Sequence, residues 1–240
     1  MKKVLASSRF YQLYAAAGVL CMGLQWIYFG TEDERGLLSR GHWAAIVSGI
    51  LVVLALAAAI YVGSDRKFPQ LPAKLRAAGG LMGVLGVGAS AVKMMVQGDW
   101  ITAVAAVLCA FAFFHIARCR FRRMRSNFLA YGVGAVFLMC YLISHYQMWS
   151  AEPEAGRYAL RLLALVFLML AFYQKAALGA GVGYPGAHHV FSAMAMMLAF
   201  GAIPGAQHPM LFAGMGCWLL LDPTVRVRKR KNRQVSHETA

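Results

Sequence analysis

Eight apolar runs, separated by short polar connections, constrain the fold of this chain more than any other feature of its sequence. A helix needs about 20 mainly apolar residues to cross a bilayer. We therefore predict an all-α integral membrane protein, a bundle of about eight transmembrane helices near residues 8–29, 42–63, 77–97, 100–117, 127–149, 155–175, 188–204 and 207–222. The last two runs are short, and Pro204 and Pro209 leave a re-entrant hairpin or a tilted pair as the alternative there.

The composition agrees with this class. Hydrophobic residues make up 60% of the chain and charged residues 14%, as is typical of a bundle embedded in a bilayer. No connection is long enough to fold as a soluble domain, so we expect one transmembrane helical domain over residues 1–222 and a basic tail over residues 223–240. The five cysteines form no CxxC pair and lie mostly inside apolar runs, so neither a disulfide scaffold nor a thiol relay is indicated.

Basic residues are distributed unevenly between the two sides of the predicted bundle. Of the 24 Lys and Arg residues, 19 fall on one side. Because basic connections are retained in the cytoplasm, we predict that both termini are cytoplasmic, in a bacterial-type cytoplasmic (plasma) membrane. The basic segments 118–125 and 226–233 should attract anionic lipid headgroups at that face. No nucleic-acid partner is expected, because the basic residues lie between apolar runs and form no soluble surface.

Polar side chains gather near the predicted outer ends of several helices. Ionisable groups at membrane depth are costly and therefore tend to have a purpose. Arg157 and Arg161 are four residues apart, which presents two cations on one helical face, and Lys93 lies about one turn inside the membrane boundary. We predict an outward-facing polar vestibule for a small anionic solute, formed by Gln25, Lys93, Gln97, Asp99, His145, Arg157 and Arg161. In the alternative, Lys93 extends to the interface and the arginines pair with nearby acids or lipid phosphates.

Glycines mark two further features. Gly179, Gly181 and Gly183 lie between the sixth and seventh runs, where we predict a flexible loop that gates an inner opening. The third run is rich in small residues, which allow close approach of helices in a membrane. The same face could instead hold a protein partner or a second copy of the chain.

The histidines leave open a haem alternative. His42 and His145 share one predicted leaflet, whereas His115, His188 and His189 share the other, and inward-facing imidazoles are good axial ligands for b-type haem. Most of them lie at helix ends, where histidine is tolerated. HExxH and other signatures of membrane enzymes are absent, so no catalytic residue, metal or cofactor is expected.

A bundle without catalytic motifs favours solute handling. We predict a small-solute transporter or a substrate-binding membrane module. A structural or regulatory subunit of a membrane complex is the first alternative, and a membrane-embedded enzyme or haem-bearing redox protein is the second.

Overall fold

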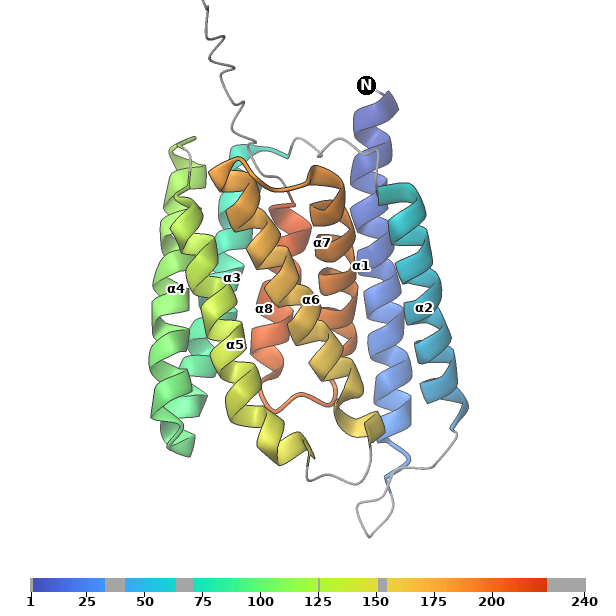
Figure 1. The fold of residues 1–240 in the computed structure, drawn as a ribbon. Coiled ribbons are helices and arrows are strands. Elements are labelled where there is room, and N and C mark those ends of the chain that lie inside the picture. Colours follow the sequence, from blue (N-terminus) through green and yellow to red (C-terminus); the bar gives the residue numbers. More distant parts are fainter. Residues whose placement is uncertain (1, 33–41, 64–70, 125, 151–154, 224–240) are drawn as a thin grey trace, which may run out of the picture.

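The computed structural model describes residues 2–32, 42–63, 71–124, 126–150 and 155–223. Within these ranges the chain is all-helical, and consecutive helices run in opposite directions (Figure 1). The helices are α1 (Lys2–Phe29), α2 (Trp43–Gly63), α3 (Ala73–Gln97), α4 (Trp100–Phe121), α5 (Phe128–Ser150), α6 (Ala155–Ala180), α7 (Pro185–Gly201) and α8 (Pro209–Leu221).

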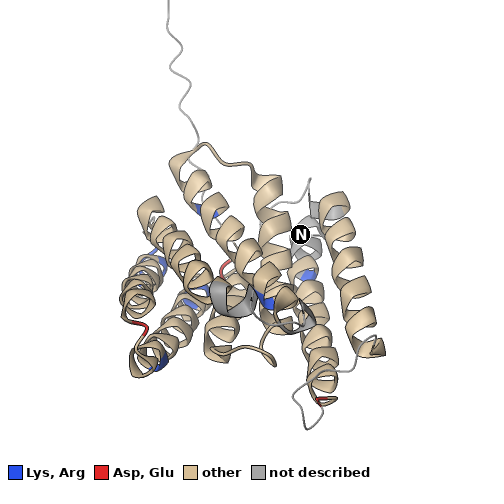
Figure 2. Cartoon of the chain, turned by 60° about the horizontal axis from the view of Figure 1, so that its bottom comes forward, with Lys and Arg blue, Asp and Glu red and all other residues tan. Residues whose placement is uncertain are grey.

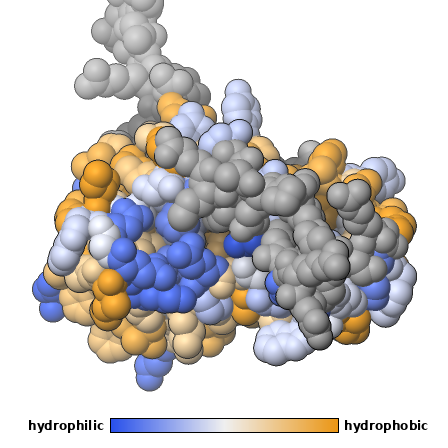
Figure 3. Space-filling model, turned by 90° about the horizontal axis from the view of Figure 1, so that it is seen from below, coloured by the Kyte–Doolittle hydropathy of each residue, from blue (hydrophilic) through white to orange (hydrophobic). Residues whose placement is uncertain are grey.

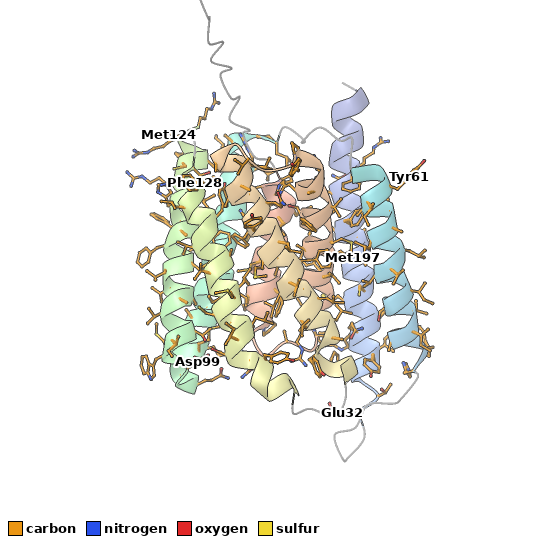
Figure 4. All side chains as sticks on the ribbon, in the orientation of Figure 1. Glu32, Tyr61, Asp99, Met124, Phe128 and Met197 are labelled. Atoms are coloured by element: carbon orange, nitrogen blue, oxygen red, sulfur yellow. The ribbon has the colours of Figure 1, made fainter. Side chains whose placement is uncertain are left out.

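The bundle has two chemically different ends. We call the end where α1 begins and α8 ends the basic end, because it carries Arg76, Arg118, Arg120, Arg122 and Arg123. Figure 4 labels Met124 and Phe128 near this end and Asp99 and Glu32 at the opposite end. Charged residues are few along the helices between the two ends (Figure 2).

The apolar surface is that of a helical membrane protein. By length and composition, α2 to α6 each contain a segment that could cross a membrane, and α8 is a shorter apolar helix. Large hydrophobic side chains such as Leu54, Leu85 and Phe111 are exposed on the outside of the bundle. An apolar surface of this extent is unusual for a monomer in water, but it suits contact with lipid.

Six helices form a closed ring. Each of α3 to α7 packs against the next helix in the chain, and α8 returns to pack against α3. The pair α1 and α2 lies at one side, where both helices pack against α7 (Figure 1). The ring therefore encloses an interior that α1 and α2 do not enter.

Aromatic side chains fill part of this interior. Trp218 of α8 stacks on Phe172 of α6 at 4.6 Å between ring centroids, and it meets Phe113 of α4 edge to face at 4.9 Å. All three side chains are almost fully buried. Such pairs contribute about 0.5–1.5 kcal/mol each beyond the area that they bury. We call these three residues the aromatic plug, because they close the ring between its two ends.

The close approach of α3 and α8 depends on two glycines. A Cβ atom on Gly86 would overlap the Met210 carbonyl oxygen and lie 2.7 Å from the Cα of Gly214. Gly83 is equally constrained by Phe113 of α4. The prediction that the small residues of the third run allow close helix contacts is thus confirmed within the chain.

Several helix ends differ from the predicted ones, and two differences matter. The sixth helix does not end at Lys175 but continues to Ala180, and the fourth continues beyond residue 117 to Phe121. The added turn of α6 consists mainly of Ala and Leu, which are good helix formers. As a result, Lys175 and Arg120 lie inside helices, where the bundle buries them.

Candidate functional site

A buried histidine lies at the opposite end, in the turn between α7 and α8. His208 is only 1% exposed, and neither of its ring nitrogens has a hydrogen-bond partner in the described part of the chain. Its ring lies edge to face against His145 and Tyr141 of α5, at 5.8 Å between centroids in both cases. The rings of Tyr141 and His145 are themselves stacked at 4.1 Å. Because buried polar atoms are rarely left without a partner, His208 marks a place where a ligand or water is expected.

Charged residues from three segments surround His208. Lys93 of α3 donates a hydrogen bond of 2.5 Å to the carbonyl oxygen of Gln207, the residue that precedes His208. Asp99 caps α4 by accepting a hydrogen bond from the Thr102 backbone, and it interacts electrostatically with both His208 and His145. Seen from this end, Figure 3 shows a hydrophilic patch on the surface that the grey atoms leave visible, with other hydrophilic residues scattered around it.

Arg161 of α6 is the last charged residue near His208, and it interacts with His145. It is 9% exposed and interacts electrostatically with both His145 and Tyr141. Four of the seven predicted vestibule residues therefore converge: Lys93, Asp99, His145 and Arg161. We call these four together with His208 the His208 site.

The chemistry of His208 at neutral pH follows from its burial. Burial, together with nearby His145 and Lys93, lowers its pKa from 6.5 to about 4, and Asp99 opposes this shift. The imidazole is therefore neutral at pH 7, with one N–H donor and one acceptor nitrogen. The uncharged ring can therefore either donate a hydrogen bond to a ligand or accept one from it.

The other three predicted vestibule residues lie elsewhere or outside the described side chains. Gln25 of α1 donates to the Ser48 hydroxyl of α2 at 2.9 Å, which joins the two outer helices. Gln97 is exposed at the end of α3. Arg157 belongs to the first turn of α6, but its side chain is outside the described part of the structure.

The predicted gating loop forms a compact helix cap. Gly179 is still inside α6, and Gly181 adopts a left-handed conformation with φ of 88°. The backbone N–H groups of Val182 and Gly183 both donate to the Ala177 carbonyl oxygen, at 3.0 and 3.1 Å. Glycine suits this position because other residues rarely adopt such a φ value.

The histidines of the haem alternative are dispersed. His115 is exposed on α4 and contacts Cys119, and His42 lies just before α2, where its ring packs against Trp43. His188 and His189 are buried at the basic end, where they bond to Ser192 and Tyr11 respectively. Over the described ranges, no group of three or more His, Cys, Asp or Glu side chains could hold a metal ion.

A second buried polar group, which the sequence did not predict, lies at the basic end. Lys175 is fully buried, donates to the backbone carbonyl of Asp222, and has its Nζ 4.0 Å from the centroid of the Trp218 ring. The Nε of Arg120 lies 3.1 Å from the Asp222 carboxylate, and Nη2 donates to the Tyr131 hydroxyl. The sequence assigned both cations to the membrane boundary, because it ended both helices too early.

The two polar groups therefore lie at opposite ends of one helical ring, with the aromatic plug between them. Comparison with models of known protein families, with curated proteins and with solved structures finds no match for this chain.

Proposed function

We propose that this chain is a small-solute transporter, or a substrate-binding membrane module, that binds a small anionic solute at the His208 site. The observation that carries the proposal is the buried imidazole of His208, whose two nitrogens have no partner among the described residues. A bound anion would accept a hydrogen bond from the imidazole N–H, and a water or a hydroxyl of the solute would donate to the other nitrogen. Two cations lie nearby: Lys93 interacts electrostatically with His208, and Arg161 interacts with His145, whose ring packs against His208.

Electrostatics favours an anion at this position. Lys93 and Arg161 carry two positive charges against the one negative charge of Asp99, while His208 is neutral. The first turn of α8 begins at Pro209, next to His208, and the N-terminal end of a helix carries a partial positive charge. A small carboxylate or an inorganic oxyanion fits this set of donors.

Transport would require the ring interior to open. The aromatic plug separates the His208 site from the buried polar group around Asp222, so passage of a solute needs Trp218 or its partners to move. Lys175, which lies over the Trp218 ring, connects the plug to the basic end. The glycine cap after α6 would gate an opening on that side.

The proposed orientation places the His208 site outside the cell. The pattern of apolar runs in the sequence assigns 19 of the 24 Lys and Arg residues to one side of the bundle, so we place both termini in the cytoplasm and assign all eight helices as spans of a bacterial-type cytoplasmic membrane. The indoles of Trp26, Trp43 and Trp100 are exposed near the opposite end, as is typical of side chains at a membrane interface.

Native mass spectrometry and thermal-shift titration test the proposal. The protein in mild detergent is titrated with a panel of mono-, di- and tricarboxylates, phosphate and sulfate. We expect at least one anion to stabilise the wild type, and Lys93→Gln, Arg161→Gln and His208→Phe to lose that stabilisation. Lys74→Gln is the matched control, because it removes an exposed lysine from the other end of α3. Equal responses of Lys93→Gln and the wild type would refute an anion site here. A haem-sized adduct in the same spectra would favour the redox alternative.

A groove on the lipid-facing side of α3 and α4 favours a second candidate function, that of a subunit in a membrane complex. The groove has a volume of about 410 Å³, and its floor includes the small residues Gly88, Ala91 and Ala110. Small residues let a transmembrane helix of another chain approach closely. Co-purification of a second membrane protein that Gly88→Leu releases would support this function, and a monomer unaffected by Gly88→Leu would exclude it.

A further inference from the structure

A separate pocket opens at the basic end, between the start of α3 and the end of α4. It has a volume of about 240 Å³ and is lined by Ala73, Arg76, Arg120, Arg123 and Met124. Three of its five lining residues are arginines: Arg76 lies in the first turn of α3, Arg120 in the last turn of α4, and Arg123 just after α4. The planar guanidinium group of arginine matches the oxygen pairs of phosphate and carboxylate groups.

The deepest of these arginines is fixed in place. Arg120 is 5% exposed, and two of its N–H groups are committed to Asp222 and Tyr131. Since the bonds to Asp222 and Tyr131 hold the guanidinium, the position of Arg120 at the wall of the pocket is set before any ligand arrives. A preorganised donor of this kind loses less conformational entropy when a ligand binds.

The third arginine occupies an unusual backbone position. Arg123 has a φ of 56°, and it is the only residue other than glycine with a positive φ in the described part of the chain. It follows the last turn of α4, where the Met124 N–H donates to the Cys119 carbonyl oxygen at 2.8 Å, a helix end that normally carries glycine. An arginine at this position brings its side chain to the pocket at the expense of backbone strain.

We infer that this pocket is a binding site for a phosphate-type oxyanion, held by Arg76, Arg120 and Arg123. The oxyanion belongs either to the headgroup of an anionic phospholipid or to a soluble phosphate compound, because both present the same oxygens at this face. The site is distinct from the His208 site, which lies at the other end of the ring, and the inference does not depend on the proposed transport function.

The test uses the full chain in mild detergent and two probes. Phosphatidylglycerol, with phosphatidylcholine as the neutral-headgroup comparison, is titrated and its adducts are counted by native mass spectrometry. Inorganic phosphate is titrated against lipid-depleted protein at constant ionic strength, and the melting temperature is followed. Arg76→Gln and Arg123→Gln remove pocket arginines, whereas Arg118→Gln removes an exposed arginine of α4 that does not line the pocket.

We expect one probe to bind roughly tenfold or more weakly to Arg76→Gln and Arg123→Gln than to Arg118→Gln, because each lost bond is charge-assisted. Selective loss of phosphatidylglycerol adducts identifies a lipid site, and selective loss of phosphate stabilisation identifies a soluble ligand. Equal loss in Arg118→Gln would show diffuse attraction to the basic surface and would overturn the inference, as would failure of both probes to bind the wild type. If a glutamine variant does not fold, Arg123→Lys takes its place, and we expect weaker binding because lysine keeps the charge but loses the planar fork.

Discussion

The crossing of α3 and α8 allows a quantitative test of how the His208 site is held. Alanine at position 86 would place its Cβ 2.7 Å from the Cα of Gly214, whereas ordinary carbon contacts begin at about 3.5 Å. The two helices must therefore separate by about 0.8 Å. Because the obstacle is backbone and cannot rotate away, we expect Gly86→Ala to destabilise the protein by about 1–3 kcal/mol. For a chain of this size that corresponds to a loss of about 2–4 °C in melting temperature per kcal/mol.

Gly88→Ala is the control for this experiment. It makes the same chemical change two residues later on α3, at a position where a new Cβ meets nothing within 4 Å. Melting can be followed by a thiol-reactive dye, since Cys21 and Cys109 are buried and become reactive on unfolding. Separation of α8 should also weaken the bond between Lys93 and the Gln207 carbonyl, so Gly86→Ala should reduce the response to anions. If Gly86→Ala and Gly88→Ala melt within about 1 °C of each other, the reasoning from close backbone contact is refuted.

Three further results are expected. Asp222→Asn removes the carboxylate that pairs with buried Arg120 and lies near buried Lys175, and it should cost about 3–5 kcal/mol. Asp99→Asn keeps a capping oxygen and should cost less than about 0.5 kcal/mol; both are measured by thermal unfolding. Arg123→Gly relieves the left-handed strain and should stabilise the protein by about 1 kcal/mol, while phosphate titration shows weaker binding. His208 has a folded pKa of about 4 and an unfolded value of 6.5, so the unfolded chain binds the extra proton between these values and stability should fall as pH decreases from 6.5 to 4. His208→Phe should reduce this slope in a pH series of melting curves, and an unchanged slope would contradict the assignment.

The sequence predicted the class of fold well, because long apolar runs leave few other structures. Each of the eight predicted ranges overlaps one helix of the structure over most of its length, and even the last two runs form separate helices, α7 and α8. The helix ends were less predictable, as polar residues can either end a helix or be buried by it. Lys175 illustrates this: its charge suggested a boundary, but the following Ala and Leu residues continue α6 to the glycine cap.

The candidate site was predicted in part. Lys93, Asp99, His145 and Arg161 stood out because charged and polar residues are rare near apolar runs. His208 did not, since it lies in a short turn between two prolines and its neighbours Lys93 and His145 are distant in sequence. Its unpartnered nitrogens are visible only in three dimensions. Gln25 was predicted to belong to the same group from its depth alone, but depth does not tell which face of α1 a residue occupies, and that face meets Ser48 of α2.

The ring of six helices has a consequence for how the chain is assembled. Its first and last members, α3 and α8, cross in close contact at Gly86 and Gly214. The face of α3 that packs against α8 therefore has no partner until all the helices between them have been synthesised. During insertion, α3 to α7 form an open arc whose closing member is the shortest helix of the bundle. Factors that shield exposed helices in the membrane would be needed most during this interval, and mutations in α8 should increase degradation more than mutations of equal size in α2.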